Sequence, residues 1–278
     1  MTGGTASPPD APRQRGVVLD RVLRTLAIAS TALAVVAILA PVLLTAALSF
    51  SGDSFYDFPP QSWGLRQYRE IFGEPPWGSA LRLSLEIALA VVVLSAAIAV
   101  PAAFAIQRSR LPGRHALYAG GLAGLIVPIT ALAVALYGVF SQLGLRGSYA
   151  GLVLAHTTLA VPVMLIVVTA ALGRIPVDLE LVAMTAGASR WRAAIGTTGR
   201  LLLPAIMAGG LLAFVTSFDE AVLISFLGTA EQTTLPKAVL DAARFGASPV
   251  VTAVATLLIA GTAVLALVVT RLAGRRLD

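Results

Sequence analysis

The chain has 278 residues, of which 57% are hydrophobic and 12% are charged, with a mean hydropathy of +0.86. A soluble domain carries about 25% charged residues, so this composition predicts a polytopic membrane protein. The chain has no cysteine and two histidines, which excludes disulfides, thiolate chemistry and a His-rich metal site. The net charge of +6 comes from arginines between apolar segments, and membrane topology explains these arginines more simply than nucleic-acid binding does.

The first residues are rich in Gly, Pro, Ser and Thr. We interpret residues 1–22 as a disordered cytoplasmic tail. An uncharged segment follows, and the first span is predicted over about 25–50, long enough for a bilayer that needs about 20 apolar residues. This apolar core is too long for a signal peptide, and further spans follow it.

A polar segment comes next, and its WGLRQYREIF pattern predicts a short amphipathic helix at the outer interface. Pro101, Pro128 and Pro162 each lie inside a later apolar segment. Proline kinks a span but is tolerated where neighbouring helices satisfy the backbone. The later spans are predicted over about 81–106, 116–142, 148–172, 201–227 and 249–272, so residues 23–273 form one domain of six transmembrane helices.

The distribution of positive charge predicts the sidedness of these spans. Six spans place both termini on one side, and that side carries 14 of the 20 Lys and Arg residues. Cytoplasmic loops carry the excess of positive charge. The termini and residues 177–200 are therefore predicted to face the cytoplasm.

Residues 177–200 predict a polar helical hairpin. Acidic residues open a first short helix, Gly187 breaks it, and a second helix leads into a span. Trp191 and Ile195 are four residues apart, so they share one face and form a candidate apolar contact. Arg190 and Arg192 flank that face and would steer it to an acidic surface. The alternative is an interfacial helix lying on membrane lipid.

Catalytic signatures are absent. No GxxxxGK[ST], HExxH or GxSxG motif occurs, and the single lysine, Lys237, is predicted to lie outside. We expect no catalytic residue, no metal site and no cofactor in this chain. If transport consumes energy, another subunit supplies it.

Two acids occur late in the fifth predicted span. Asp219 and Glu220 lie about 19 and 20 residues from Leu201, in the outer half of the membrane. One alternative is contact with a cationic substrate. The other is an ion pair or a helix-end hydrogen bond. Glu86 with Arg82 is interpreted as a helix pair, and His156 as a packed histidine bonding across helices.

The central stretch resembles the cytoplasmic EAA loop of ABC-importer permeases, a pattern of EAA, Gly and I-x-LP. The residues here that fit this pattern are Ala183, the turn from Gly187 through Ala188 to Ser189, Trp191, Ile195 and Leu203-Pro204. The stretches WGLRQYREIF, LLAFVTSFDEAVLISFL and TTLPKAVLDAARFGASPVVTA look like permeases of the spermidine/putrescine type. The pattern's glutamate is one position early, at Glu180, so a charged contact of that acid with the ATPase would be shifted or lost here.

This resemblance implies a type I importer permease (MetI-like) fold in a bacterial inner membrane. The implied partners are a second permease subunit in a heterodimer, two ATP-binding subunits that hold ATP and Mg, and a periplasmic substrate-binding protein. It implies a small cationic solute, a polyamine. The rivals are a permease for another small solute, a secondary carrier or channel, and a membrane anchor. The ATPase-coupling residues would be Glu180, Ala183, Gly187, Ala188, Ser189, Arg190, Trp191, Ile195, Leu203 and Pro204, and the substrate path Ser217, Phe218, Asp219 and Glu220.

Overall fold

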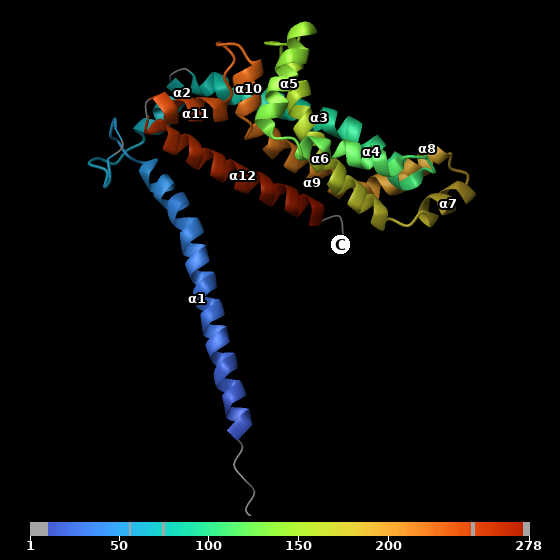
Figure 1. Cartoon of the computed structure of the whole chain (residues 1–278), viewed down its shortest axis with the longest axis horizontal. Helices are drawn as coiled ribbons and strands as arrows, with labels where there is room; N and C mark the ends of the chain where they lie inside the picture. Colours follow the sequence, from blue (N-terminus) through green and yellow to red (C-terminus); the bar gives the residue numbers. More distant parts are fainter. Residues whose placement is uncertain (1–10, 56, 74–75, 246–247, 275–278) are drawn as a thin grey trace, which may run out of the picture.

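The computed structural model describes residues 11–55, 57–73, 76–245 and 248–274, and this part of the chain is predominantly helical. Its extended segments meet in one antiparallel bridge, between Ser51 and Trp63. Figure 1 shows an elongated body of packed helices from which one long helix projects. The predicted all-α membrane architecture is therefore confirmed.

Three helices form the core: α3 (Trp77–Arg108), α6 (Tyr149–Arg174) and α9 (Arg200–Phe218). Small residues let their backbones approach closely. A Cβ placed on Gly209 would lie 3.3 Å from the Met164 side chain, and one on Gly210 would lie 3.3 Å from Val92. These glycines therefore set the spacing of α9 against its two neighbours.

The first helix, α1 (Ala11–Leu48), stands away from this core (Figure 1). None of the most apolar part of its 21–48 segment is buried within the chain. The helix begins at Ala11, inside the stretch predicted to be disordered, because helix propagates easily from a long apolar segment once it has nucleated. Residues 1–10 of the predicted tail lie outside the described residues.

The third predicted span, 116–142, is broken in the structure. It consists of α4 (Arg114–Gly121), the 3-10 turn η1 (Ala123–Leu125) and α5 (Ile129–Gln142), with a bend of 100°. Pro128 causes the break, since proline lacks an N–H and disfavours helix at the residue before it. The sequence predicted a kink here, and the structure shows a sharp corner.

The fifth predicted span, 201–227, also differs. A helical run of 29 residues extends from Arg190 to Phe218, and α10 (Val222–Leu227) follows as a separate helix. The helix that carries this segment therefore begins within the hairpin, before residue 201, and ends at Phe218, before Asp219. Glu220 satisfies the free N–H groups at the start of α10, which favours two helices over one.

Among the remaining helices, the first and the last agree with the sequence prediction, and the helix between them was not predicted from the sequence. α2 (Arg66–Gly73) is the predicted short amphipathic helix, α11 (Leu235–Phe245) follows α10, and α12 (Val250–Gly274) is the sixth apolar segment. In the described residues four helices are long and apolar enough to cross a membrane, and there are five if the bent pair counts as one span. The apolar part of α12 described there is shorter, Val250–Val264.

The two ends of the body are held by different polar contacts. At one end, Tyr149 donates to the Glu86 carbonyl (2.9 Å), and the Leu235 N–H donates to Ser84 (2.8 Å). Arg82 and Glu86 form the predicted helix pair there, with Nε 2.7 Å from Oε1. At the other end α3 and α6 finish beside the 177–200 hairpin.

Candidate functional site

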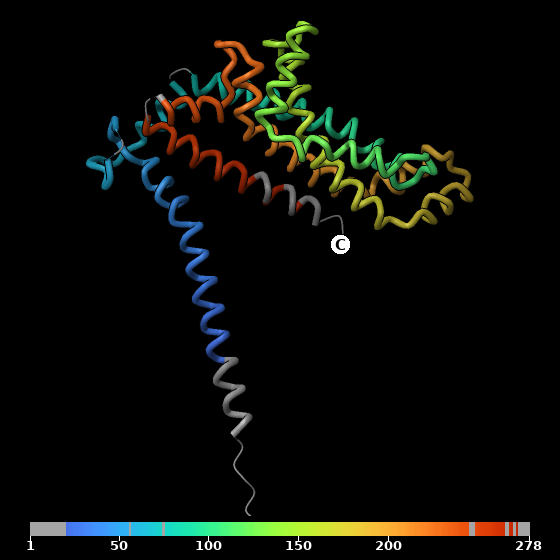
Figure 2. Tube along the Cα trace, viewed as in Figure 1, coloured from blue at the N-terminus to red at the C-terminus, as the bar shows by residue number. Residues whose placement is uncertain are grey.

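The predicted hairpin is present at the end of the body where α3 and α6 finish. α7 (Asp178–Thr185) leads into a turn, and α8 (Arg190–Ala193) and the π-helical turn η2 (Ala194–Gly199) lead without a break into α9. Figure 2 shows the chain doubling back through this turn. The structure therefore has a short helix, a break at Gly187 and a second short helix that continues into α9.

Gly187 makes the turn between the two short helices. Its φ is +91°, in the left-handed region that only glycine enters without strain. The Gly187 N–H donates to the Met184 carbonyl (3.0 Å) and the Ala188 N–H to the Ala183 carbonyl (3.1 Å). This pair of hydrogen bonds is a Schellman cap, so the turn is a defined structure that depends on glycine.

The second short helix carries the exposed surface of the hairpin. Ser189 caps it, its hydroxyl accepting from the Arg192 N–H at 3.4 Å. Trp191 and Ile195 are 78% and 66% exposed. Arg190 beside them is also exposed. The helix thus presents an apolar face flanked by arginines, the surface that the sequence predicted.

Other residues of the predicted coupling set are less accessible. Ala183, Ala188, Leu203 and Pro204 are half-buried. A groove of about 590 Å³ runs between α7 and α8, and one wall is Trp191. The residues lining this groove are Arg108, Val177, Glu180, Leu181, Met184, Arg190, Trp191 and Ala194. The half-buried residues therefore support the hairpin, while the groove and the α8 face are its accessible surface.

Glu180 has a different position from the one expected for a partner-contacting acid. Its carboxylate accepts a 2.5 Å hydrogen bond from the Thr198 hydroxyl and lies 3.8 Å from Nε of Arg108. It therefore faces its own chain. The one-residue shift of this acid along the sequence rotates it by about 100° around the helix, which accounts for its inward position.

Arg108 and Thr198 were not singled out from the sequence. Arg108 belongs to a basic turn that the charge asymmetry of membrane proteins already explained. Thr198 is one of two adjacent threonines in a stretch without a distinguishing pattern. Only the packing of α3 against the hairpin brings them together, so no local sequence signal could have found them.

The predicted substrate path begins at Ser217, which the structure places in a helix contact. His156 on α6 has Nδ1 3.1 Å from both the carbonyl and the hydroxyl of Ser217. Because a carbonyl only accepts, Nδ1 carries the hydrogen. His156 is buried and bonds across helices as predicted, and Ser217 joins α6 to α9.

The two acids after Ser217 have different environments. Glu220 is buried and accepts from the backbone N–H groups of Val222 and Leu223, the latter at 2.9 Å. This is the helix-end alternative. Asp219 is exposed at the C-terminal end of α9, where the helix dipole adds partial negative charge. A cation would meet Asp219 and not Glu220.

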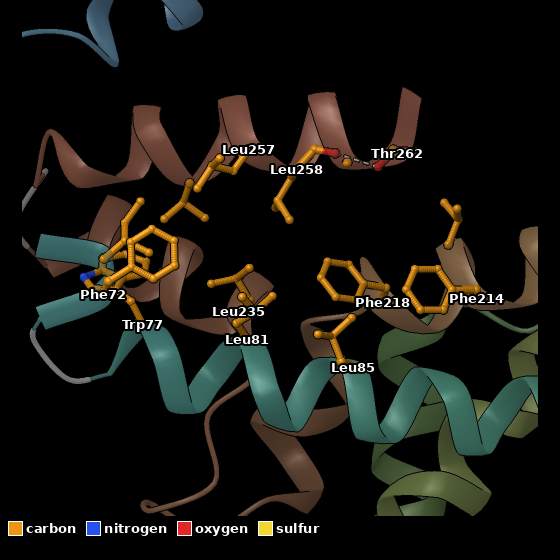
Figure 3. Close-up of a pocket in the computed structure, with 14 residues that line it drawn as sticks. Phe72, Trp77, Leu81, Leu85, Phe214, Phe218, Leu235, Leu257, Leu258 and Thr262 are labelled. Carbon is orange, nitrogen blue, oxygen red and sulfur yellow. Dashed lines mark hydrogen bonds between the residues drawn. The ribbon is translucent and has the colours of Figure 1, made fainter. Parts of the chain in front are cut away.

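Phe218 faces an apolar cavity instead of a polar path. Figure 3 shows Phe218 and Phe214 side by side on α9, with Leu85 of α3 below them and Leu258 of α12 above. The two rings stack with centroids 5.4 Å apart. The cavity measures about 440 Å³. The cavity is lined mostly by apolar side chains, and Asp219 is not among them. Phe218 and Asp219 therefore do not form one continuous polar surface.

The described residues contain no group of three or more His, Cys, Asp or Glu arranged to hold a metal ion. The polar contacts at the hairpin base and at His156 link helices, and those of Ser189 and Glu220 cap helix ends. The helical body therefore has the hairpin at one end, and the hairpin continues into α9, which ends next to the exposed Asp219.

Comparison with known proteins gives one family for this chain. The family model described as "Binding-protein-dependent transport system inner membrane component" matches residues 97–278. The putrescine transport system permease protein PotI of Escherichia coli K12 is 31% identical over 228 residues, which cover 79% of this chain and 80% of PotI.

A second relative has a different printed substrate. The sulfoquinovosyl glycerol transport system permease protein SmoH of Agrobacterium fabrum is 32% identical over 178 residues. That match covers 64% of this chain and 62% of SmoH, a little under two thirds of its length.

Among solved structures, a bacterial alginate ABC transporter in complex with an alginate pentasaccharide-bound periplasmic protein aligns with a TM-score of 0.63. Its identity to this chain is 17%, with 93% of this chain and 94% of that chain covered. At this identity the likeness bears on the fold.

Proposed function

This chain belongs to the family of binding-protein-dependent transport system inner membrane components, the permease subunits of ABC importers, and from that premise we propose that it forms the path for a small cationic solute, a polyamine. The permease is not itself an enzyme, and ATP hydrolysis lies in partner subunits. Our proposal concerns the solute, the residues that couple the chain to those subunits, and the orientation of the chain in the membrane.

The extent of the similarity to the putrescine permease is the observation that carries the solute proposal. That similarity covers 79% of this chain, whereas the family match is confined to residues 97–278. It therefore includes sequence before the shared family region. The exposed Asp219 supports the same solute class, because a carboxylate at a helix C-terminus favours a cation.

The hairpin is proposed to dock on an ATPase subunit. Trp191 and Ile195 supply exposed apolar surface, and Arg190 and Arg192 supply the charge that steers association. An exposed aromatic flanked by arginines is typical of an interface. In this proposal the hairpin and both termini lie in the cytoplasm, where ATP and Mg are bound by the partners.

The full assembly would contain a second permease subunit in a heterodimer, two ATPase subunits and a periplasmic binding protein in the bacterial inner membrane. Closure of the ATPases on ATP would move the hairpin. Because Arg190 to Phe218 is one helical run, that movement would reach the region of Asp219. Hydrolysis would reverse it.

A second solute class has its own support. The 32% identity to the sulfoquinovosyl glycerol permease favours an importer for a sugar derivative. In that case the hairpin keeps its role, and Asp219 would contact hydroxyl groups or serve the helix end only. A carrier driven by an ion gradient would need neither the hairpin nor an ATPase.

Whole-cell uptake separates these functions. Host cells lacking this chain are expected to lose most high-affinity uptake of radiolabelled putrescine and to regain it with the chain restored. Uptake in the restored cells should require ATP and survive collapse of the membrane potential. Unchanged putrescine uptake in the deletion strain would contradict the solute proposal, and uptake that follows the potential alone would contradict the importer mechanism.

A further inference from the structure

Three elements meet at the base of the hairpin. Arg108 is the last residue of α3, and its side chain is 15% exposed. Its guanidinium donates to the Ile175 carbonyl (2.7 Å), just past the end of α6, and more weakly to the Leu172 carbonyl (3.5 Å). Because unsatisfied carbonyls at a helix end carry partial negative charge, the arginine ties the ends of α3 and α6 together.

The same guanidinium faces the hairpin. Nε of Arg108 has no hydrogen-bond partner among the described atoms, and Oε1 of Glu180 lies 3.8 Å away. Glu180 is 19% exposed. In such a shielded place, removing one charge leaves the other without its counter-charge. The ion pair therefore holds α7 to the end of α3.

Thr198 closes the arrangement from the other arm of the hairpin. It is fully buried and donates to the same carboxylate oxygen, at 2.5 Å. It lies in the π-helical turn η2, and π-turns inserted in α-helices occur often at functional positions. One carboxylate thus joins an arginine of α3 to a hydroxyl on the helix that runs into α9.

We infer that Arg108, Glu180 and Thr198 form a latch through which the hairpin moves α3 and α6 together with α9. The inference rests on the proposed docking of the hairpin and names the route by which docking reaches the helices. Covalent continuity alone would move two helices: α6, which the first arm follows after three residues, and α9, which the second arm enters. The latch adds α3, whose Arg108 also holds the end of α6, so the hairpin and the adjoining ends of the core respond as one body.

Distances between spin labels test this latch without knowledge of the solute. The chain has no native cysteine, so Thr185→Cys and Arg110→Cys, both at exposed positions, label α7 and the chain two residues past the end of α3. The sample is the complex with its co-purified ATPase, with and without MgATP and vanadate. A second pair, Thr185→Cys with Ser141→Cys on α5, reports whether the hairpin moves at all.

In the parent complex the 185–141 distance should shift with nucleotide while the 185–110 distance stays fixed. In Glu180→Gln and in Thr198→Val the 185–110 distance should shift as well, by about 2 Å, the scale of helix movements in switching proteins. Thr198→Ser keeps the hydroxyl and should behave like the parent. Asp178→Asn, an exposed acid on the same helix, is the matched charge control.

A shift of the 185–110 distance in the parent would overturn the latch, and so would a fixed distance in both Glu180→Gln and Thr198→Val. Because both variants act on one carboxylate, their double variant should shift no further than Glu180→Gln, and additive shifts would also overturn it. Absence of any co-purified ATPase, or of any 185–141 shift, would instead contradict the proposed docking.

Discussion

Replacing Gly187 with valine is expected to weaken the binding of the ATPase subunits by about tenfold, while leaving the chain folded in the membrane. Gly187 has a φ of +91°, and a Cβ built on it would meet nothing within 4 Å. The substitution therefore acts on the backbone of the turn and not on packing. Left-handed conformations cost an L-residue about 1–2 kcal/mol, and 1.4 kcal/mol is about tenfold in affinity.

Asparagine is the matched control at this position. It tolerates left-handed conformations better than other L-residues, so Gly187→Asn should retain most of the affinity. Titration of the purified ATPase onto nanodisc-bound variants measures this difference. Equal affinity of Gly187→Val and the parent would show that the turn does not position the docking surface. Equal loss in both variants would show that any side chain there collides with the partner.

Removing the charge of Asp219 is expected to lower putrescine uptake at limiting substrate by about tenfold. Asp219 is exposed at the end of α9, so Asp219→Asn removes one attraction for a cation and breaks no side-chain hydrogen bond or ion pair found in the described chain. A charged hydrogen bond contributes about 1.5 kcal/mol or more, which is the tenfold effect. Initial rates of labelled putrescine uptake in the restored deletion strain provide the measurement.

Glu220 supplies the comparison, because it differs from its neighbour in role. Glu220→Gln keeps an oxygen to accept from the backbone of α10 and should leave uptake unchanged. Glu220→Ala removes the cap and should lower the stability of the purified chain by about 1 kcal/mol. Unchanged uptake in Asp219→Asn would show that Asp219 does not contact the solute. A loss of uptake confined to Glu220→Gln would show that the cation meets Glu220 and not Asp219.

Most of the fold could be predicted from the hydropathy of the segments and from the positions of glycine. Apolar segments between basic turns indicate spans whatever their neighbours are, and Gly187 indicates a turn because few residues adopt its conformation. The corner at Pro128 and the end of α9 at Phe218 were not predictable in the same way. Proline allows both a kink and a corner, and packing around the break decides between them.

For the 177–200 hairpin, the exposed face of α8 could be predicted from the sequence, whereas the contacts at the base of the hairpin could not. Trp191 and Ile195 stand four residues apart, and that spacing alone placed them on one face. The inward position of Glu180 depends on Arg108 and Thr198, which are 72 residues before it and 18 residues after it in the sequence. Contacts at such separations come from tertiary packing, which a single sequence does not encode in any local pattern.

The most direct test of the coupling role is to purify the chain from its native membranes through a C-terminal tag, after gentle solubilisation. An ATP-binding subunit should co-purify with the parent chain and be largely lost from Gly187→Val. Recovery of the parent chain alone, well folded and without ATPase activity, would contradict the claim that the 177–200 hairpin couples this permease to ATP hydrolysis.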